Sequence, residues 1–439
     1  MVLLLSTYDL GRQPFGLASP AAWLQRAGIE VVTRDLSRGP LDDAEAQRAT
    51  IVAFYLPMHT ATRLALPVID RVRERNPAAT LVAYGLYAPL SSQLLRDRGV
   101  TAILGPEAEA ELVGLAQGAS AGQPTQDTSA LPRLAFITPV RGGLPGLERY
   151  ATVQMPDGTR RIAGATDATR GCKHRCRHCP IVPVYDGRFR VVSADVVEAD
   201  INQQVAAGAE HITFGDPDFF NGPSHARRIV ERLHARHPSL TYDVTIKVEH
   251  LLLHRDLLPL LAQTGCAFIT TAVEALDDTV LSYLEKGHTR EGFIEAVTVC
   301  REAGVSLSPT FVAFTPWTTL ASYRDLLTTI ESLDLVEHVA PVQWGLRLLI
   351  TQGSRLLELE DIRRHVRAFD AKSLTFPWVH DDPEVDALQS SVMRIVGTNT
   401  SPSRRELFAR VCEMAGVKPS QPTLRSRATI PYLNEPWYC

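Results

Sequence analysis

The first part of the chain alternates short apolar runs with stretches in which apolar residues recur at helical spacing. The runs VLLLS, IEVVTRDL, IVAFYL, TLVAYG and TAILG are separated by helical patterns, among them residues 20–27 and 64–75. Buried parallel strands read as continuous apolar runs joined by helices, so this alternation predicts a doubly wound, Rossmann-like α/β domain over residues 1–118. Ligands bind such sheets at the carboxyl ends of the strands. The loops expected there are residues 8–16, 55–59, 84–88 and 105–107.

The composition changes after this domain. Residues 119–132 lie in the stretch AQGASAGQPTQDTSALP, which is small and polar without apolar periodicity and predicts a linker. Within RYATVQMPDGTRRIAG, the triplet Pro-Asp-Gly separates two short alternating runs, which predicts a β-hairpin in a connector over residues 133–164.

The βα alternation then resumes over residues 165–355. A strand leading into Cys172 and the runs HITFGDPD, TYDVTIKVE, CAFITTAVE, VSLSPTFVAF and VAPVQWGLRLLI make six repeats. Six repeats are too few for a closed eight-stranded barrel, so we predict an open, partial (β/α)6 TIM-type barrel with its chemistry at the carboxyl ends of the strands. Residues 356–439 read as a small region of mixed helix and loop. The helices expected in the barrel cover residues 224–236, 255–263, 278–285, 290–303 and 322–333.

Composition and charge narrow the classes of function. The chain has 439 residues, which indicates more than one domain, and its net charge of -4 argues against a nucleic-acid interface. The amino-terminal apolar run is too short for a signal peptide or a membrane span, so we expect a cytoplasmic protein without a membrane partner. An odd number of cysteines, 7, does not suggest a disulfide framework and favours a metal site.

Three cysteines are crowded into the stretch GCKHRCRHCP. Cys172, Cys176 and Cys179 have the spacing C-x3-C-x2-C, whereas the remaining cysteines are scattered along the chain. A structural zinc site needs four ligands, and His174 and His178 could complete one, but the short tether makes such closure awkward. A 4Fe-4S cluster normally takes four cysteines, so three thiolates would leave one iron open to an external molecule.

This motif resembles that of the radical S-adenosylmethionine superfamily, where it follows the first strand of a partial barrel. The resemblance implies that the open iron binds the amino and carboxylate groups of S-adenosylmethionine. It also implies that an electron from the cluster cleaves the sulfonium to give a 5′-deoxyadenosyl radical. The residue before the last cysteine is usually aromatic in the family; here it is His178, whose flat imidazole can stack on adenine.

Further segments are similar to the family's cofactor-binding positions. Phe214-Gly215-Asp216-Pro217 resembles a Gly-Gly-Glu-Pro turn that receives the cofactor's ammonium, a contact that falls to Asp216 or to Asp218, although DPD alone reads as a turn. Glu274 ends an apolar strand and is similar to a glutamate that binds the ribose hydroxyls; the next segment, KGHT, resembles a Lys-Gly-x-Thr motif. Arg347 either pairs with the cofactor carboxylate or forms a structural ion pair. The implied set is His178, Gly215, Asp216, Pro217, Asp218, Glu274 and Arg347.

The doubly wound domain ahead of the barrel resembles the cobalamin-binding class of these enzymes. Modules that place a histidine under cobalt carry Asp-x-His-x-x-Gly, but the loop at residues 8–16 has no histidine. Either cobalamin binds without a ligand from this loop, or the domain is a scaffold that binds no corrin. The candidate cobalamin-binding residues are Gln13, Pro14, Gly16, Leu56, Gly85 and Gly105.

The tail adds a closer resemblance. The segments CRHCPIVPVYDGRFRVV and ITFGDPDFFNGP and the final PYLNEPWYC look like a group of radical proteins named for a Cys-Cys-Ala-Glu-Pro or Cys-selenocysteine-Ala-Glu-Pro tail (CCAEP/CUAEP). We hypothesise a selenoprotein whose translation continues past Cys439 through a UGA codon. The alternative is an ordinary frayed terminus with an incidental cysteine.

Together these patterns predict a radical enzyme that carries out cobalamin-linked methyl or alkyl transfer to a small-molecule substrate. Its electron donor would be a flavodoxin or ferredoxin. An alternative is transfer of the 3-amino-3-carboxypropyl group to a soft atom such as arsenic. A non-enzymatic alternative is an iron–sulfur or cobalamin redox sensor, which would need a DNA-binding or partner-binding element that the sequence does not show.

Overall fold

The computed structural model describes residues 1–118, 131, 133–398, 403–418 and 430–434. The predicted linker at 119–132 falls outside the described residues except for residue 131, and the tail thiol Cys439 also falls outside them. Within the described part of the chain, no helix combines the length and the apolar character needed to cross a bilayer.

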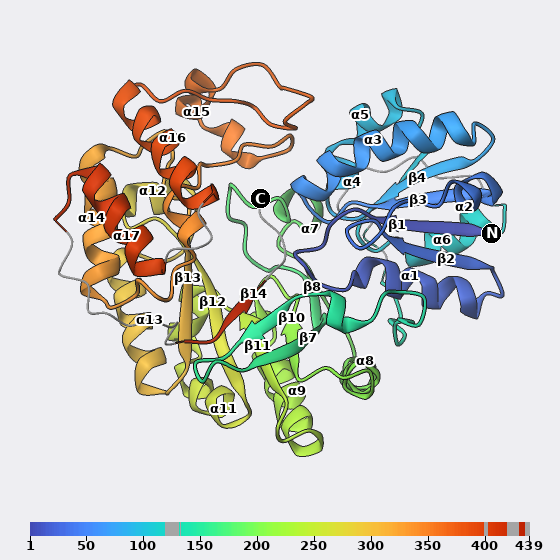
Figure 1. Cartoon of the computed structure of the whole chain (residues 1–439), viewed down its shortest axis with the longest axis horizontal. Helices are drawn as coiled ribbons and strands as arrows, with labels where there is room; N and C mark the ends of the chain where they lie inside the picture. The colour runs from blue at the N-terminus through green and yellow to red at the C-terminus, as the bar shows by residue number, and fades with distance from the viewer. Residues whose placement is uncertain (119–130, 132, 399–402, 419–429, 435–439) are drawn as a thin grey trace.

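The amino-terminal domain is a five-stranded parallel sheet in the order β2-β1-β3-β4-β5. Alternate side chains of a strand point to opposite faces of a sheet. Accordingly, Leu3 and Leu5 pack in one buried cluster with Ile69, and Leu4 packs in another with Leu17. Figure 1 shows α1 and α6 on one face and α3 to α5 on the other, so the predicted doubly wound domain is confirmed. The strands are β1 (Val2–Ser6), β2 (Val31–Asp35), β3 (Ile51–Tyr55), β4 (Thr80–Tyr84) and β5 (Ala102–Ile103). The helices are α1 (Phe15–Arg26), α2 (Asp43–Arg48), α3 (His59–Arg75), α4 (Tyr87–Leu90), α5 (Ser92–Asp97) and α6 (Glu109–Ala116).

The second sheet is an open, curled half-barrel, as predicted. Its seven strands lie in the order β13-β12-β11-β10-β7-β6-β14, and the run from β7 to β13 is parallel. The parallel strands are β7 (Arg160–Thr166), β10 (His211–Phe214), β11 (Thr241–Thr245), β12 (Cys266–Glu274) and β13 (Ser306–Phe311). The covering helices are α8 (Ala194–Ala206), α9 (Pro223–Arg236), α10 (Val248–Leu253), α11 (Leu258–Gln263), α12 (Asp278–Tyr283), α13 (Arg290–Glu302) and α14 (Leu320–Ser332).

The sixth predicted strand is reduced to a single parallel bridge between Phe314 and Arg347. The segment before it forms a 3-10 helix, η5 (Pro341–Trp344), that begins at a proline and is followed by Gly345. Proline has no N–H to donate to a neighbouring strand, which explains why this apolar run does not begin as a strand beside β13.

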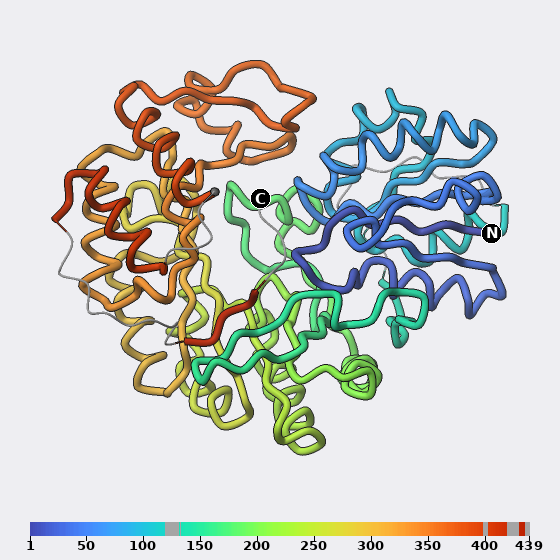
Figure 2. Tube along the Cα trace, viewed as in Figure 1, coloured from blue at the N-terminus to red at the C-terminus, as the bar shows by residue number. Residues whose placement is uncertain are grey.

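The predicted hairpin is confirmed by antiparallel pairing of β6 (Thr152–Gln154) with β7. Its outer edge is covered by β14 (Tyr432–Asn434), which pairs antiparallel with β6 although it comes from the end of the described chain. Figure 2 shows this strand lying beside the hairpin. The carboxyl-terminal region therefore completes the barrel sheet. Its helices are α15 (Glu360–His365), α16 (Pro383–Thr398) and α17 (Arg404–Ala415).

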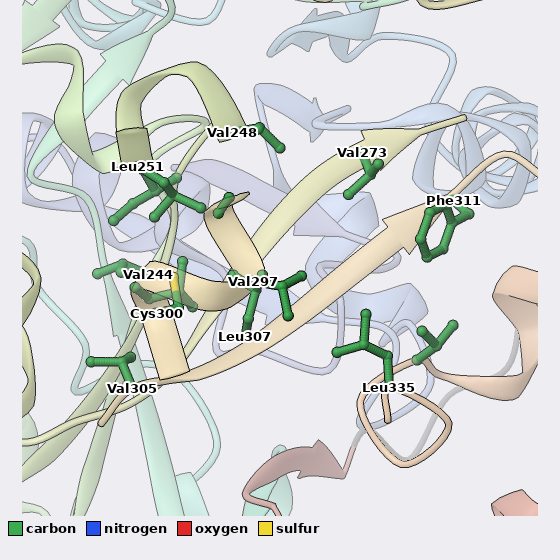
Figure 3. Close-up of a cluster of buried hydrophobic side chains, with 14 of the residues drawn as sticks. Val244, Val248, Leu251, Val273, Val297, Cys300, Val305, Leu307, Phe311 and Leu335 are labelled. Atoms are coloured by element: carbon green, nitrogen blue, oxygen red, sulfur yellow. The ribbon is translucent and has the colours of Figure 1, made fainter. Parts of the chain in front are cut away.

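The barrel core packs apolar side chains of the sheet against the surrounding helices. Figure 3 shows Cys300 of α13 among Val244, Val297 and Leu307. Cys300, Cys266 and Cys412 all belong to this buried cluster. These cysteines act as small apolar residues in the core and are not grouped with Cys172, Cys176 and Cys179.

Candidate functional site

The cysteine loop connects the two strands of a short antiparallel ribbon, β8 (Thr169–Gly171) and β9 (Phe189–Val191). This ribbon lies at the carboxyl end of the parallel strands. Gly171 has φ +79, and an added Cβ there would lie 2.4 Å from the ring of Tyr185. A glycine is therefore required where the loop starts. The loop is also held at its middle, where the Arg177 amide donates to the Leu284 carbonyl at 3.0 Å.

The three thiols of this loop share a poorly solvated environment. Burial raises the pKa of Cys172 to about 11 and the pKa of Cys179 to about 12, and the neighbouring thiol of Cys176 adds to both shifts. The positive charges of Lys247 and Lys286 act in the opposite direction. Without metal these two thiols are thus protonated at neutral pH, and metal binding has to displace the protons.

Next to the loop, the structure brings together His178 and Glu274, two of the residues expected at the cofactor. His178 Nε2 lies 3.1 Å from Glu274 Oε1, and the buried Lys286 Nζ lies 3.4 Å from the same oxygen. Burial alone would raise the pKa of Glu274, but Lys286 and His178 lower it to about 2. Glu274 also has φ 71, an unusual value outside glycine, and local strain of this kind is often found at functional sites. The carboxylate is therefore anionic and fixed at the end of β12.

Asp216 has a structural role that the sequence did not predict. Its carboxylate accepts hydrogen bonds from the Ala168 amide at 2.9 Å and from the Thr169 hydroxyl at 2.6 Å, and its side chain is buried. Both partners belong to the corner that leads from β7 into β8. In the structure Asp216 stabilises this corner of the backbone. The sequence had led us to expect a contact between Asp216 and the cofactor ammonium.

The pH dependence of stability tests this role of Asp216. Burial raises its pKa from 3.8 to about 7, so the folded chain keeps a proton that the unfolded chain releases. The free energy of unfolding should then fall as the pH rises from about 4 to about 7, and Asp216→Asn should lack this fall. Urea unfolding of both proteins at about pH 5 and about pH 8 measures it, with Asp381→Asn, an exposed site, as the control. Equal pH dependence in the wild type and Asp216→Asn would contradict the assignment.

The neighbours of Asp216 lie at two different places. Gly215 and Pro217 line a pocket between the two domains, and a Cβ at Gly215 would lie 2.4 Å from Asp167 Oδ1. Asp218 is fully buried, accepts from the Phe220 amide at 3.1 Å and faces two histidines. The turn therefore divides its residues between the interdomain pocket and the barrel wall.

Arg347 forms the structural ion pair that was the alternative reading of this residue. Its guanidinium donates to Asp386 Oδ1 and to the Trp378 carbonyl, both at 2.6 Å, and lies over the Trp378 ring at 3.5 Å. These contacts tie the barrel to the carboxyl-terminal region. The structure does not bring Arg347 to the His178 and Glu274 pair.

The interdomain pocket encloses about 690 Å³, open solvent at its mouth included. Its walls are the predicted loops at the carboxyl ends of the first sheet and, opposite them, the residues that lead into the cysteine loop. From the first domain come Gly16, Tyr55, Pro57, Gly85, Pro106 and Glu109, and from the barrel come Asp167, Thr169, Arg170, Gly171, Gly215 and Pro217. A ligand in this pocket therefore lies next to the start of the cysteine loop.

Two of the six candidate cobalamin residues, Gly16 and Gly85, line this pocket, and the other four are not among its lining residues. Gly85 has φ +107, and an added Cβ would lie 2.8 Å from the Leu56 carbonyl oxygen. The backbone at Gly85 therefore packs against the backbone at Leu56 more closely than a larger residue would allow. Gly16 is held by the Tyr84 hydroxyl, which donates to its carbonyl at 2.7 Å. Of the other four, Gln13 donates to the Pro145 carbonyl, Pro14 precedes α1, Leu56 is buried and Gly105 accepts from the Gly85 amide.

Buried ion pairs fix the two walls of the pocket relative to each other. Arg170 of β8 donates to Glu109 at 2.8 Å and lies 3.4 Å from Glu107, and the Tyr185 hydroxyl donates to Glu107 at 2.8 Å. Glu107 lies in one of the loops that were predicted to bind a ligand, whereas Arg170 and Tyr185 were not predicted. The only available signal was their closeness to the cysteines along the chain.

Two other residues were missed, Lys247 and His250, which follow β11. Both are buried beside the cysteine loop, and Lys247 Nζ lies 3.1 Å from His174 Nδ1. Polar residues directly after an apolar strand, at the end of a parallel sheet that carries the cysteines, were the signal that could have found them.

Comparison with known proteins supports this arrangement. Residues 167–320 match the family described as the radical SAM superfamily. No curated protein matches the sequence.

Solved structures share the two-domain fold. The radical S-adenosylmethionine methyltransferase TsrM from Kitasatospora setae, with tryptophan substrate and a SAM analog bound, aligns with a TM-score of 0.61 at 19% identity over 76% of this chain and 71% of that chain. TsrM with cobalamin and a 4Fe-4S cluster bound covers 94% of this chain and 99% of its own at 16% identity and a TM-score of 0.61. The cobalamin-dependent S-adenosylmethionine radical enzyme OxsB, with aqua-cobalamin and S-adenosylmethionine bound, aligns at 0.68 and 12% identity over 94% and 70%. At these identities the likeness establishes the fold: a Rossmann-like domain followed by a partial TIM-type barrel.

Proposed function

We propose that this chain, whose residues 167–320 form a radical SAM domain, is an enzyme that cleaves S-adenosylmethionine reductively with a 4Fe-4S cluster. We further propose that it transfers a methyl or alkyl group to a small-molecule substrate with the help of cobalamin. One observation carries the proposal: a single loop presents three thiols beside the His178–Glu274–Lys286 cluster, next to the interdomain pocket.

The cysteine loop fits the cluster by its donor set. Cys172, Cys176 and Cys179 supply soft thiolates from one short loop, and the other described cysteines are packed in the apolar core. When bound, the cluster and S-adenosylmethionine supply one-electron chemistry at the sulfonium. Lys247 and Lys286 place positive charge near the thiols, which favours their deprotonated, metal-binding form.

Glu274 is the residue best placed to orient the nucleotide. Its carboxylate is fixed by Lys286 and His178, is anionic at neutral pH, and can accept hydrogen bonds from a ribose diol. His178 presents an imidazole beside it, and His178 Nδ1 has no hydrogen-bond partner among the described residues. These two side chains would hold S-adenosylmethionine at the carboxyl end of β12.

The interdomain pocket is the place where we expect cobalamin to bind. The pocket lies at the carboxyl ends of the first sheet, where doubly wound domains bind ligands, and Gly16 and Gly85 are among the residues that line it. The residues that line the pocket include no histidine, so its described walls offer no imidazole to the lower face of the cobalt. The TsrM and OxsB structures with cobalamin bound support a corrin in a protein of this fold.

Product analysis tests the proposed reaction. The protein, reconstituted anaerobically with iron, sulfide and cobalamin, is incubated with S-adenosylmethionine and either dithionite or reduced flavodoxin, and its nucleoside products are identified by mass spectrometry. We expect 5′-deoxyadenosine or S-adenosylhomocysteine, with formation dependent on Cys176. Accumulation of 5′-methylthioadenosine would instead indicate 3-amino-3-carboxypropyl transfer. No cleavage with any reductant would indicate a redox sensor.

We also propose that the chain extends beyond Cys439 as a selenoprotein tail. The resemblance of the final segment to the CCAEP/CUAEP group supports this extension. Sequencing of the gene should show TGA after the Cys439 codon, followed by codons for Ala-Glu-Pro. Any other downstream sequence removes the proposal.

A further inference from the structure

We propose that His174, Asp218 and His250 bind one divalent transition-metal ion, such as Zn²⁺ or Fe²⁺, at a site separate from the three cysteines. His174 Nε2 lies 3.2 Å and His250 Nδ1 lies 2.6 Å from the same oxygen, Asp218 Oδ2. The three ligand atoms all lie within 4.8 Å of one another. Two imidazoles and one carboxylate form the donor set that borderline divalent metals prefer.

The three side chains come from three separate segments and converge in the interior. His174 belongs to the cysteine loop, Asp218 follows β10, and His250 lies in α10. Asp218 and His250 are each 1% exposed. A carboxylate that is so well shielded from water needs positive charge beside it, and a bound cation provides that charge.

One nitrogen of the group lacks the hydrogen bond that its burial requires. His250 Nδ1 is buried and has no hydrogen-bond partner among the described residues. Its 2.6 Å contact with Asp218 is an ionic contact that does not meet the geometry of a hydrogen bond. A metal ion accepts the lone pair of such a nitrogen, so it would satisfy an atom that the protein alone leaves unsatisfied.

The residues around His174 provide the outer contacts of a metal site. Lys247 Nζ lies 3.1 Å from His174 Nδ1 and 3.1 Å from Glu249 Oε2, and that glutamate oxygen lies 3.7 Å from the same His174 nitrogen. Metal at Nε2 requires the proton of the imidazole to move to Nδ1. Lys247 can only donate, so it then has to turn away from Nδ1 while it keeps its ion pair with Glu249. Nδ1–H can donate to Glu249 once the two side chains close their present separation of 3.7 Å. A carboxylate that accepts from the outer nitrogen of a ligating histidine is typical of metal sites.

This site differs from the zinc alternative that the sequence raised. That alternative combined the cysteines with His174 and His178, but His178 is engaged by Glu274. The site proposed here uses no cysteine. Because His174 lies between Cys172 and Cys176, the ion would fasten the cysteine loop to β10 and α10 independently of the cluster.

Zinc binding to the full chain tests the proposal. The variant Cys172→Ser/Cys176→Ser/Cys179→Ser, which cannot hold the cluster, is equilibrated with Zn²⁺, and bound zinc is measured by elemental analysis and X-ray absorption. We expect one zinc per chain with nitrogen and oxygen ligands only, and an increase in Tm on zinc addition. His250→Gln in this background should lose both the zinc and the Tm increase. His254→Gln, which changes the neighbouring histidine, should keep both.

Three results would overturn the proposal. They are less than stoichiometric zinc in the triple variant, sulfur ligands in its absorption spectrum, and stoichiometric zinc that survives His250→Gln. The Tm of each variant without zinc shows whether it is folded. Because the triple variant cannot cleave S-adenosylmethionine, the outcome is independent of the proposed function. The wild-type chain with its cluster assembled should bind the same additional zinc.

Discussion

Replacing Cys172, Cys176 or Cys179 singly by alanine is expected to abolish cleavage of S-adenosylmethionine, with a loss on the order of 10³-fold or more. A cluster that normally takes four thiolates cannot keep its composition when only two remain. The loss should appear both in the iron content of the anaerobically reconstituted protein and in the yield of nucleoside products. The two measurements distinguish a lost cluster from a cluster that is present but inactive.

Cys300→Ala is the matched control for this prediction. It removes a thiol of the same chain, but one that lies in the apolar barrel core and not in the loop. It should keep its full iron content and its cleavage activity, at a modest cost in stability. A cysteine-loop variant that retained iron and activity at the level of Cys300→Ala would contradict the assignment of the ligands.

Glu274→Gln is expected to impair both stability and use of S-adenosylmethionine. Lys286 is 3% exposed, and without the carboxylate its charge is buried beside a neutral amide. Loss of one member of a buried ion pair costs about 3–5 kcal/mol. Loss of charge-assisted hydrogen bonds to the nucleotide should lower kcat/KM for S-adenosylmethionine by about 10-fold to 100-fold. Urea unfolding and initial rates of cleavage measure the two effects.

The double variant Glu274→Gln/Lys286→Met separates these two roles. It removes the unpaired charge, so most of the lost stability should return, whereas kcat/KM should remain low. Glu231→Gln, on the exposed face of α9, controls for a glutamate substitution as such. Recovery of cleavage together with stability would show that Glu274 is only a structural partner of Lys286.

Patterns of apolar residues predicted the elements well, because strands and helices are set by short-range periodicity. The parallel strands β10 to β13 and the helices α13 and α14 lie where the runs and spacings placed them. The prediction of a sixth strand was wrong because its apolar run contains Pro341. Proline has no backbone N–H for a strand ladder, and the segment forms a 3-10 helix instead. Apolar content alone does not distinguish a strand from a buried loop.

The sequence named His178 and Glu274 as cofactor residues, and these roles stay predictions. His178 and Glu274 meet because the loop and the strand end at the same edge of the sheet. The roles of Asp216 and Arg347 depend on partners distant in sequence, Ala168 and Asp386, that no local pattern reveals. The same long-range dependence explains why the burial of Lys286 could not be read from the sequence, since lysines are usually exposed.

The interdomain pocket, too, was predictable only in part. Its location followed from the general rule that loops at the carboxyl ends of parallel strands bind ligands. Its facing wall, with Arg170 between Glu107 and Glu109, depends on how the two domains dock. Buried ion pairs between segments far apart in the chain join the two sides of this wall.

The central claim is that one iron of the cluster has no protein ligand and binds S-adenosylmethionine. Spin-resonance spectroscopy of the anaerobically reduced protein tests it most directly, with S-adenosylmethionine labelled with nitrogen-15 at its amino group. We predict four irons per chain and a coupling between the cluster and the labelled nitrogen. A single zinc ion in place of the irons, or a cluster spectrum without such coupling because a side chain occupies the fourth iron, would contradict the account.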